Sequence, residues 1–311
     1  MSLYGRKYNL KFGGYEIKSG TGDNNLRFTF RIEKEFCHTP NYSEITVYNM
    51  RWDDALAVID EGMHIQLYAG YEDGPFGLIF DGKVFQPMFD RENVVDFKYT
   101  FHCLDGLSYI MNNLISRTFD KDYTQADIVA EMLADSSTQI PQGYISEYLS
   151  QKKLARGKVV FGDVKEYLKE ITEDNNTVGT MYDGKFHVYS YLDPITTPPY
   201  IIGPYPGSLI GVPQQIPMGV AFKCLLNPDI KIIPPMKVKL DTKLIIQMLQ
   251  RQGELITPLD RGGTYRVFKV VHIGDTRGND WYTEIIGVNQ LGPLSGLLGE
   301  AVPAEDQNIQ G

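Results

Sequence analysis

Cysteine is scarce in this 311-residue chain, and no long run of apolar residues is present. The three cysteines, Cys37, Cys103 and Cys224, are odd in number and lie far apart in the sequence. This excludes a disulfide framework and indicates reduced thiols in a cytosolic site of folding. The longest uncharged stretch, residues 194–222, holds seven prolines and four glycines, so it does not suit a membrane helix.

Basic residues are fewer than acidic residues. Lysine and arginine number 30 against 39 acidic residues, which gives a net charge of −9. Such a chain has no general electrostatic attraction for nucleic acid or anionic lipid. Residues 1–11 carry Arg6, Lys7 and Lys11 without an apolar core, so we expect no signal peptide. The length predicts about two domains, and 42% hydrophobic residues exclude disorder of the whole chain.

Sequence patterns for cofactor binding and nucleophilic catalysis are weak or missing. Residues 77–84 have the P-loop spacing G-x-x-x-x-G-K, but they end in Val84, which cannot ligate Mg²⁺. Two Cys/His pairs, at positions 37–38 and 102–103, could supply metal ligands. Neighbouring residues of a strand point to opposite faces, so each pair offers at most one inward ligand. We therefore predict no catalytic residue, no cofactor and no metal.

Paired carboxylates leave one route to an enzyme, because glycoside cleavage needs two acidic side chains. The candidate pairs are Asp53/Asp54, Glu166/Glu170 and Glu173/Asp174. The first pair suits a helix N-terminus, and the other two suit a solvated helix face beside Lys165 and Lys169. A hydrolase is therefore the less favoured interpretation.

Glycine, proline and tyrosine are abundant, which is typical of many short strands and turns. Residues 25–33 alternate apolar and polar side chains, as a half-buried strand does. We expect further strands at residues 44–48, 64–71, 79–85 and 94–103, with a hairpin turn at 90–93. A helix capped by Asn49 and stopped by Gly62 lies between them. Residues 1–105 are thus predicted to form a β-barrel or sandwich with one helix.

The middle of the chain, residues 106–193, has a different pattern. Thr124 and Asp127 form a variant capping box that opens one amphipathic helix, and a second helix begins near Asp163. Asp183 and Gly184 stand between two strand-like segments and fit a type I′ turn. These signals predict a small α+β unit.

Residues 194–290 return to β structure after a proline- and glycine-rich connector at 194–217. Strands are expected at residues 220–225, 236–240, 265–273 and 281–288, with a turn at 227–229 and a candidate helix at 242–251. Residues 291–311 are a tail without an expected fold of its own. The residues alone therefore indicate a mainly β fold with an α+β insert, in a non-enzymatic protein that takes part in an assembly.

Three stretches, taken together, resemble the baseplate hub proteins of contractile-tailed bacteriophages. They are residues 154–163 (LARGKVVFGD), residues 219–230 (GVAFKCLLNPDI) and residues 265–283 (YRVFKVVHIGDTRGNDWYT). The opening fits as well, with residues 37–49 (CHTPNYSEITVYN) between a strand and a short helix. The order and spacing of these stretches carry the resemblance, which extends over residues 5–290.

The resemblance implies a homotrimer in which each chain carries two tail-tube-like β-barrel domains, residues 1–105 and 194–290, beside a small α+β domain at 106–193. A ring of six barrels would match the six-fold tail tube on one side. The trimer itself would match a three-fold central spike on the other side. The implied function is a structural baseplate hub that adapts these symmetries and initiates tube assembly, with no enzymatic activity.

The implied partners are further copies of the chain, the central spike protein, the tail tube protein or a tube initiator, and other baseplate proteins including the tape measure. DNA would only pass through the lumen, and the chain would assemble in the bacterial host cytoplasm into the virion tail baseplate without membrane insertion. The alternatives are a hub of a phage-tail-like bacteriocin and a tail-associated peptidoglycan hydrolase. In the tail, residues 291–311, we predict that Leu291, Leu294, Leu297 and Leu298 contact the spike or a neighbouring chain.

Overall fold

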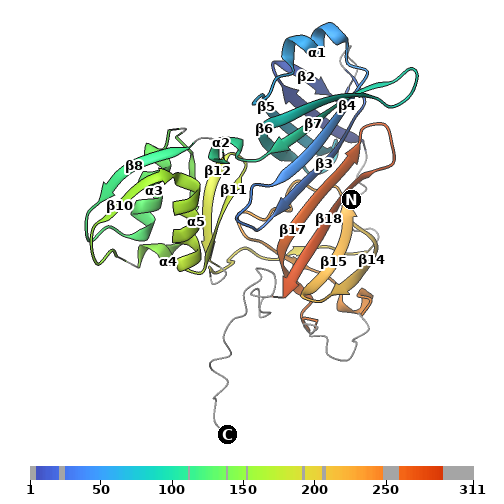
Figure 1. Ribbon diagram of the computed structural model, residues 1–311. Coiled ribbons are helices and arrows are strands. Elements are labelled where there is room, and N and C mark those ends of the chain that lie inside the picture. Colours follow the sequence, from blue (N-terminus) through green and yellow to red (C-terminus); the bar gives the residue numbers. More distant parts are fainter. Residues whose placement is uncertain are drawn as a thin grey trace.

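The structure is a computed structural model, and it describes residues 5–20, 25–110, 113–137, 139–151, 153–190, 193–204, 208–247 and 259–289. Figure 1 shows a long twisted sheet made from the two ends of the chain, with a separate α+β unit to one side. The prediction of a mainly β fold with an α+β insert is confirmed. The division of the chain into domains at the predicted boundaries stays a prediction.

The first part of the chain forms seven antiparallel strands and one short helix. These are β1 (Arg6–Phe12), β2 (Tyr15–Lys18), β3 (Phe28–Glu35), β4 (Tyr42–Tyr48), α1 (Trp52–Val58), β5 (His64–Tyr71), β6 (Phe76–Arg91) and β7 (Phe97–Leu104). The predicted alternation is confirmed in β3, where Phe28, Phe30 and Ile32 are buried and Arg31 is exposed. Inward residues of all these strands form one apolar core.

Three local predictions in this part are wrong. Helix α1 ends at Val58 with Ile59 as its C-cap, so Gly62 does not stop it. Asn49 does not cap α1; the N-cap is Arg51, which makes no side-chain cap hydrogen bond. Asn49 is left-handed (φ 57°), and its side chain accepts a hydrogen bond from the Phe97 amide (2.9 Å). The β6–β7 turn lies at residues 92–96 instead of 90–93, because the Asn93 carboxamide accepts the amides of Val95 and Asp96 (2.8 Å each).

In the middle of the chain the two predicted helices and the predicted hairpin are present, and the structure adds, among its described residues, five elements that the sequence did not predict. Its elements are α2 (Leu107–Ile110), β8 (Leu114–Phe119), α3 (Gln125–Asp135), β9 (Gln142–Ile145), α4 (Glu147–Ser150), β10 (Lys158–Asp163), α5 (Val164–Asp174), β11 (Thr177–Tyr182) and β12 (Lys185–Ser190). The capping box of Thr124 and Asp127 is present, and Asp163 caps α5. The β11–β12 hairpin turns at Asp183 (φ 47°) and Gly184 (φ 75°), as a type I′ turn requires.

The last part of the chain returns to the sheet. It contributes β13 (Tyr200–Ile201), β14 (Leu209–Ile216), β15 (Gly219–Leu225), β16 (Lys237–Lys239), a 3₁₀ turn η1 (Thr242–Leu244), β17 (Thr264–Asp275) and β18 (Trp281–Asn289). The predicted connector at 194–217 thus holds two strands. Gly211 (φ 70°) lies in an irregularity of the β14–β15 register between Ile210 and Gln214, and pairing resumes after it despite Pro213.

The candidate helix at residues 242–251 is wrong over its described part. Only η1 is helical there, and Ile246 instead forms a parallel bridge with Gln214 of β14. The end of the predicted helix lies outside the described residues, and so does the tail at 291–311.

A single 13-stranded sheet joins the two β parts. Its main path runs β14-β15-β18-β17-β3-β4-β7-β6-β5-β1-β2, while β13 and β16 branch from β17. The junction is the antiparallel pairing of β3 with β17, from Lys269 opposite Glu35 to Asp275 opposite Thr29. Trp281 and Leu226 of the last part pack into the first core, so the two cores adjoin across this junction.

Candidate functional site

The outward face of the shared sheet is a polar surface that crosses both β parts. Along β3 the inward positions belong to the cores, while Arg31, Glu33 and Glu35 point to the other side. Cross-strand partners continue the face, since Val271 lies opposite both Glu33 and Glu284 in the ladder. The elements that build the face are therefore β15, β18, β17, β3, β4, β7 and the second half of β6.

Ion pairs hold neighbouring strands together on this face. Lys269 on β17 reaches Glu33 (3.3 Å) and Glu35 (3.1 Å) on β3, and Lys223 on β15 reaches Glu284 on β18 (3.1 Å). Partial burial opposes ionisation of Glu33, but the hydrogen bond from Arg31 and the charge of Lys269 leave its pKa lowered. The cations on this face are thus each matched by a carboxylate, and the surface is charged but balanced.

The polar face continues over the first β part. Glu44 lies opposite Arg31 and His102 in the ladder, and Tyr42 stacks on His102 with ring centroids 5.9 Å apart. The hydroxyls of Thr46 and Thr100 hydrogen-bond across β4 and β7 (3.1 Å). Tyr42 is exposed and Glu44 and His102 are half-buried, so this part of the face reaches water, whereas Thr46 is buried.

With β14 added, the face spans a run of eight strands from β14 to β6, and among the described residues each end of this run has an edge that is unpaired over part of its length. The first half of β6 pairs with β5, but residues 86–91 pair only with β7 among the described strands. At the other end β14 pairs with β15, and its second edge is partly occupied by described residues. Ile246 donates to Pro213 (2.9 Å) and accepts from Gln215 (2.8 Å), and Leu209 donates to Gly203 (3.0 Å). Open sheet edges can accept a strand from another chain.

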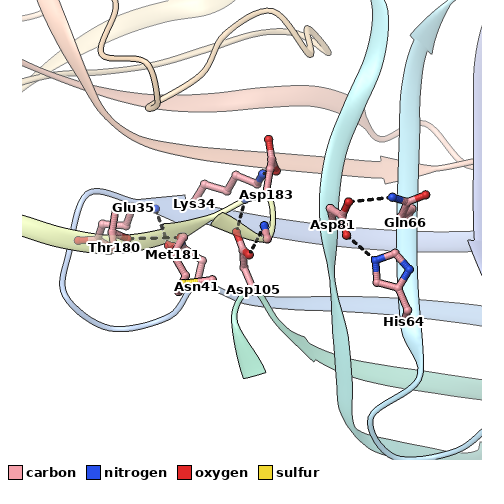
Figure 2. A network of polar contacts seen from close by, with 11 residues as sticks. Lys34, Glu35, Asn41, His64, Gln66, Asp81, Asp105, Thr180, Met181 and Asp183 are labelled. Atoms are coloured by element: carbon pink, nitrogen blue, oxygen red, sulfur yellow. Dashed lines mark hydrogen bonds and ion pairs between the residues drawn. The ribbon is translucent and has the colours of Figure 1, made fainter. Parts of the chain in front are cut away.

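A buried charge network fixes the α+β unit to the sheet (Figure 2). Lys34 of β3 is 3% exposed and forms an ion pair with Asp183 in the β11–β12 turn. Asp105, which follows β7 and is fully buried, accepts hydrogen bonds from the amides of Asp183 (2.8 Å) and Gly184 (3.1 Å). The network therefore connects the end of β3, the end of β7 and one hairpin of the α+β unit.

The charges of this network shift one another's ionisation. Burial raises the pKa of Asp105 to about 6, although the Lys34 ammonium opposes the shift. Burial disfavours the charged form of Lys34, but Tyr182, Asp183 and Asp105 together raise its pKa. The Lys34 ammonium lies 4.0 Å from the centroid of the Tyr182 ring. One cation and two carboxylates in a buried place make the junction sensitive to the loss of any one of them.

The acidic side chains and the P-loop-like segment that the sequence offered as candidates do not come together in one site. Glu170 pairs with Lys158 (3.1 Å) and Glu173 with Lys169 (3.7 Å), which places both on the solvated face of α5. Asp53 and Asp54 lie in the first turn of α1, and residues 77–84 lie within β6.

The Cys/His pair at positions 102–103 does not form a metal site. Cys103 is buried and His102 points to the opposite face, as expected for neighbours in a strand. No group of three or more His, Cys, Asp or Glu side chains is placed to hold a metal ion in the described ranges. Within the same ranges, no helix combines the length and the apolar character that a membrane crossing needs.

Two features of these surfaces were missed from the sequence. Lys34 stands at an inward position of the alternating strand, which is the signal that could have identified a buried cation. The edge strand β14 was hidden by the prolines and glycines around it. The predicted contact residues Leu291, Leu294, Leu297 and Leu298 lie outside the described residues.

Comparison with known proteins gives a likeness in structure alone. No protein-family model matches the sequence, and no curated protein matches it. The tail protein from Neisseria meningitidis matches with a TM-score of 0.58 and 10% identity, over 92% of this chain and 97% of that chain. The 43 kDa tail protein of prophage MuSo2 from Shewanella oneidensis matches with a TM-score of 0.60 and 9% identity, over 92% and 98%.

A third solved structure is an E. coli component of the type VI secretion system, described as structurally similar to the T4 bacteriophage tail proteins gp27 and gp5. It matches with a TM-score of 0.56 and 10% identity, over 91% of this chain and 78% of that chain. The likeness covers nearly the whole chain, so the two β parts and the α+β unit recur together. The chain has the fold of these tail proteins.

Proposed function

We propose that this protein is the structural hub of a contractile tail baseplate, in a phage or in a related tail-like particle. Three copies form a ring, and each copy contributes two curled β parts, so the ring presents six similar units. One side of the ring matches a six-fold tail tube and starts its assembly. The other side binds a three-fold central spike. The α+β unit lies outside the ring.

The observation that carries the proposal is the shared sheet with one core-packed face, one polar face and, among the described residues, an edge at each end that is unpaired over at least part of its length. In the ring, the edge of β6 in one copy meets the edge of β14 in the next, so that the sheets join into a continuous inner wall. The polar face lines the channel. Its cations are matched by carboxylates, so DNA meets no net positive charge and slides past.

The first experiment measures the mass of the purified protein by light scattering on a sizing column, alone and with its candidate spike. We expect three chains of 35.2 kDa each, in at least one of the two conditions. Negative-stain images of the same fractions should show a ring with a central channel. A strict monomer in both conditions would contradict the hub function.

The proposed role is assembly rather than catalysis, and a zymogram on purified cell walls tests this. We expect no lytic band. A band that disappears in Glu166→Gln or Glu170→Gln would show a peptidoglycan hydrolase instead. The tail leucines are proposed to contact the spike or a neighbouring copy, so deletion of residues 291–298 should weaken spike binding and leave the fold intact by circular dichroism.

A further inference from the structure

A group of lysines gathers where β16 branches from β17. Lys237 and Lys239 lie two positions apart on β16, so their side chains leave the strand on the same side. Lys243 follows in η1, and the amide of Lys231 donates to the sulfur of Met236 (3.0 Å), which brings Lys231 to the start of β16. The four residues Lys231, Lys237, Lys239 and Lys243 are called the lysine surface below.

The lysine surface has no counter-charge in the described part of the chain. None of its four ammonium groups lies within ion-pair distance of a described carboxylate, unlike the lysines of the polar face. The carboxylate of Asp241 instead accepts the backbone amide of Lys243 (3.0 Å). Even with Asp229 and Asp241 counted, residues 229–243 keep two excess positive charges, on a chain whose net charge is −9. The surface therefore fits an acidic partner.

The chain carries an acidic segment directly after its last strand. Residues 290–311 lie outside the described residues, and their sequence contains Glu300, Glu305 and Asp306 but no lysine or arginine. The three carboxylates follow the leucines of residues 291–298 and fall within seven positions of one another. Residues 300–306 thus have the charge that the lysine surface lacks.

The last strand ends close to the lysine surface. Asn289, the final residue of β18, is paired with Tyr265 of β17, and Tyr265 is paired on its other side with Val238 of β16. Two strand spacings of about 4.8 Å each place Asn289 about 10 Å from β16. An extended chain from Asn289 to Glu300 spans roughly 36 Å, at about 3.3 Å per residue. Residues 300–306 are therefore within reach of the lysines of their own chain.

We propose that residues 300–306 bind the lysine surface of the same chain. Exposed ion pairs are individually weak. A short tether, however, gives the acidic segment an effective concentration on the order of millimolar at the surface, and a segment from a second copy lacks this advantage. The leucine-rich residues 291–298 then form a loop that is held at both ends, which keeps them available for contact with the spike or a neighbouring copy.

Zero-length carbodiimide coupling of the full chain tests this contact, because the reagent joins a carboxylate to a lysine amine only where the two touch. Unlabelled and heavy-isotope-labelled chains are unfolded together in urea and refolded, so that any oligomer contains both forms, and circular dichroism checks the refolding. Mass spectrometry of the digested protein then identifies each link and its isotope form. Lys121, an exposed lysine between β8 and α3 with no ion pair among the described residues, is the matched control.

We expect the tail carboxylates to link to the lysine surface within one isotope form and not to Lys121. The links should disappear at about 1 M salt, where the Debye length is about 3 Å. Lys239→Glu should lower the remaining links, at Lys237 and Lys243, several-fold, whereas Lys121→Glu should leave them unchanged.

Two results would overturn the proposal. Links between isotope forms, in the proportion that random mixing gives, would assign the acidic segment to a second copy. An absence of links, or equal linking to Lys121, would remove the contact altogether. The hub function stands or falls separately, by the mass measurement.

Discussion

The buried ion pair between Lys34 and Asp183 allows a sharp prediction about the attachment of the α+β unit. Lys34→Met keeps the aliphatic stem against Tyr182 but removes the only cation that this network contains among its described members. Asp105, which is fully buried, and Asp183, which is 22% exposed, then lack their counter-charge. Removal of one partner from a buried pair costs about 3–5 kcal/mol of unfolding free energy.

A matched control is Lys269→Met. Lys269 also bridges two carboxylates, Glu33 and Glu35, but it is 26% exposed. Solvent screens that pair, so its loss should cost about 0–1 kcal/mol. Urea unfolding, followed by circular dichroism and by tyrosine and tryptophan fluorescence, compares the two variants with the wild type. Equal losses in both variants would refute the reasoning, since burial would then have no influence.

The same network predicts how the loss depends on pH. Burial raises the pKa of Asp105 to about 6 in the folded chain. The protonated form of Asp105 therefore contributes to the unfolding free energy. That contribution is complete below the pKa of about 4 that Asp105 has in the unfolded chain, and it is lost as the pH rises through the pKa in the folded chain. Without the Lys34 charge, the pKa of Asp105 in the folded chain rises further. The difference in unfolding free energy between wild type and Lys34→Met should therefore be smaller at pH 5 than at pH 8.

Two further predictions concern single elements. Thr124→Ala removes the side-chain acceptor of the α3 capping box and should cost about 1 kcal/mol in urea unfolding, whereas Thr124→Ser should be near neutral. Burial lowers the pKa of His187 to about 4 and, together with the nearby Lys34 charge, that of His272 to about 3. Because both folded values lie below the unfolded value of about 6.5, stability is present above that pH and is lost on acidification toward the folded values. For His272 the slope approaches about 1.4 kcal/mol per pH unit, and thermal melts of wild type and His272→Gln between pH 4 and 7 measure it.

Local chemistry made some elements predictable. The alternation around Phe28 and Ile32, the capping box at Thr124 and the Asp183–Gly184 turn are each specified by residues within one strand or one turn of helix. The edge strand β14 was not predictable in this way. Its prolines and glycines are typical of a loop, and only pairing with β15 gives the segment its extended form.

Contacts between distant segments explain the rest of what the sequence did not reveal. Pairing of β3 with β17 depends on residues more than two hundred positions apart, which no local pattern contains. Lys34 is recognisable as an inward cation, but its partners come from a hairpin in another unit. The polar face likewise becomes one surface only after β3 and β17 meet.

The pairing of β3 with β17 also has a consequence for how the chain folds during synthesis. Lys269 and Glu35, partners in that pairing, are 234 positions apart. At roughly 5–20 residues per second, a ribosome needs on the order of 10–50 s to make the intervening chain. Throughout that time β3 lacks its partner, and Trp281 is missing from the first core. The nascent amino-terminal part therefore carries an open edge that attracts other chains, and it depends on chaperones or rapid completion to avoid aggregation.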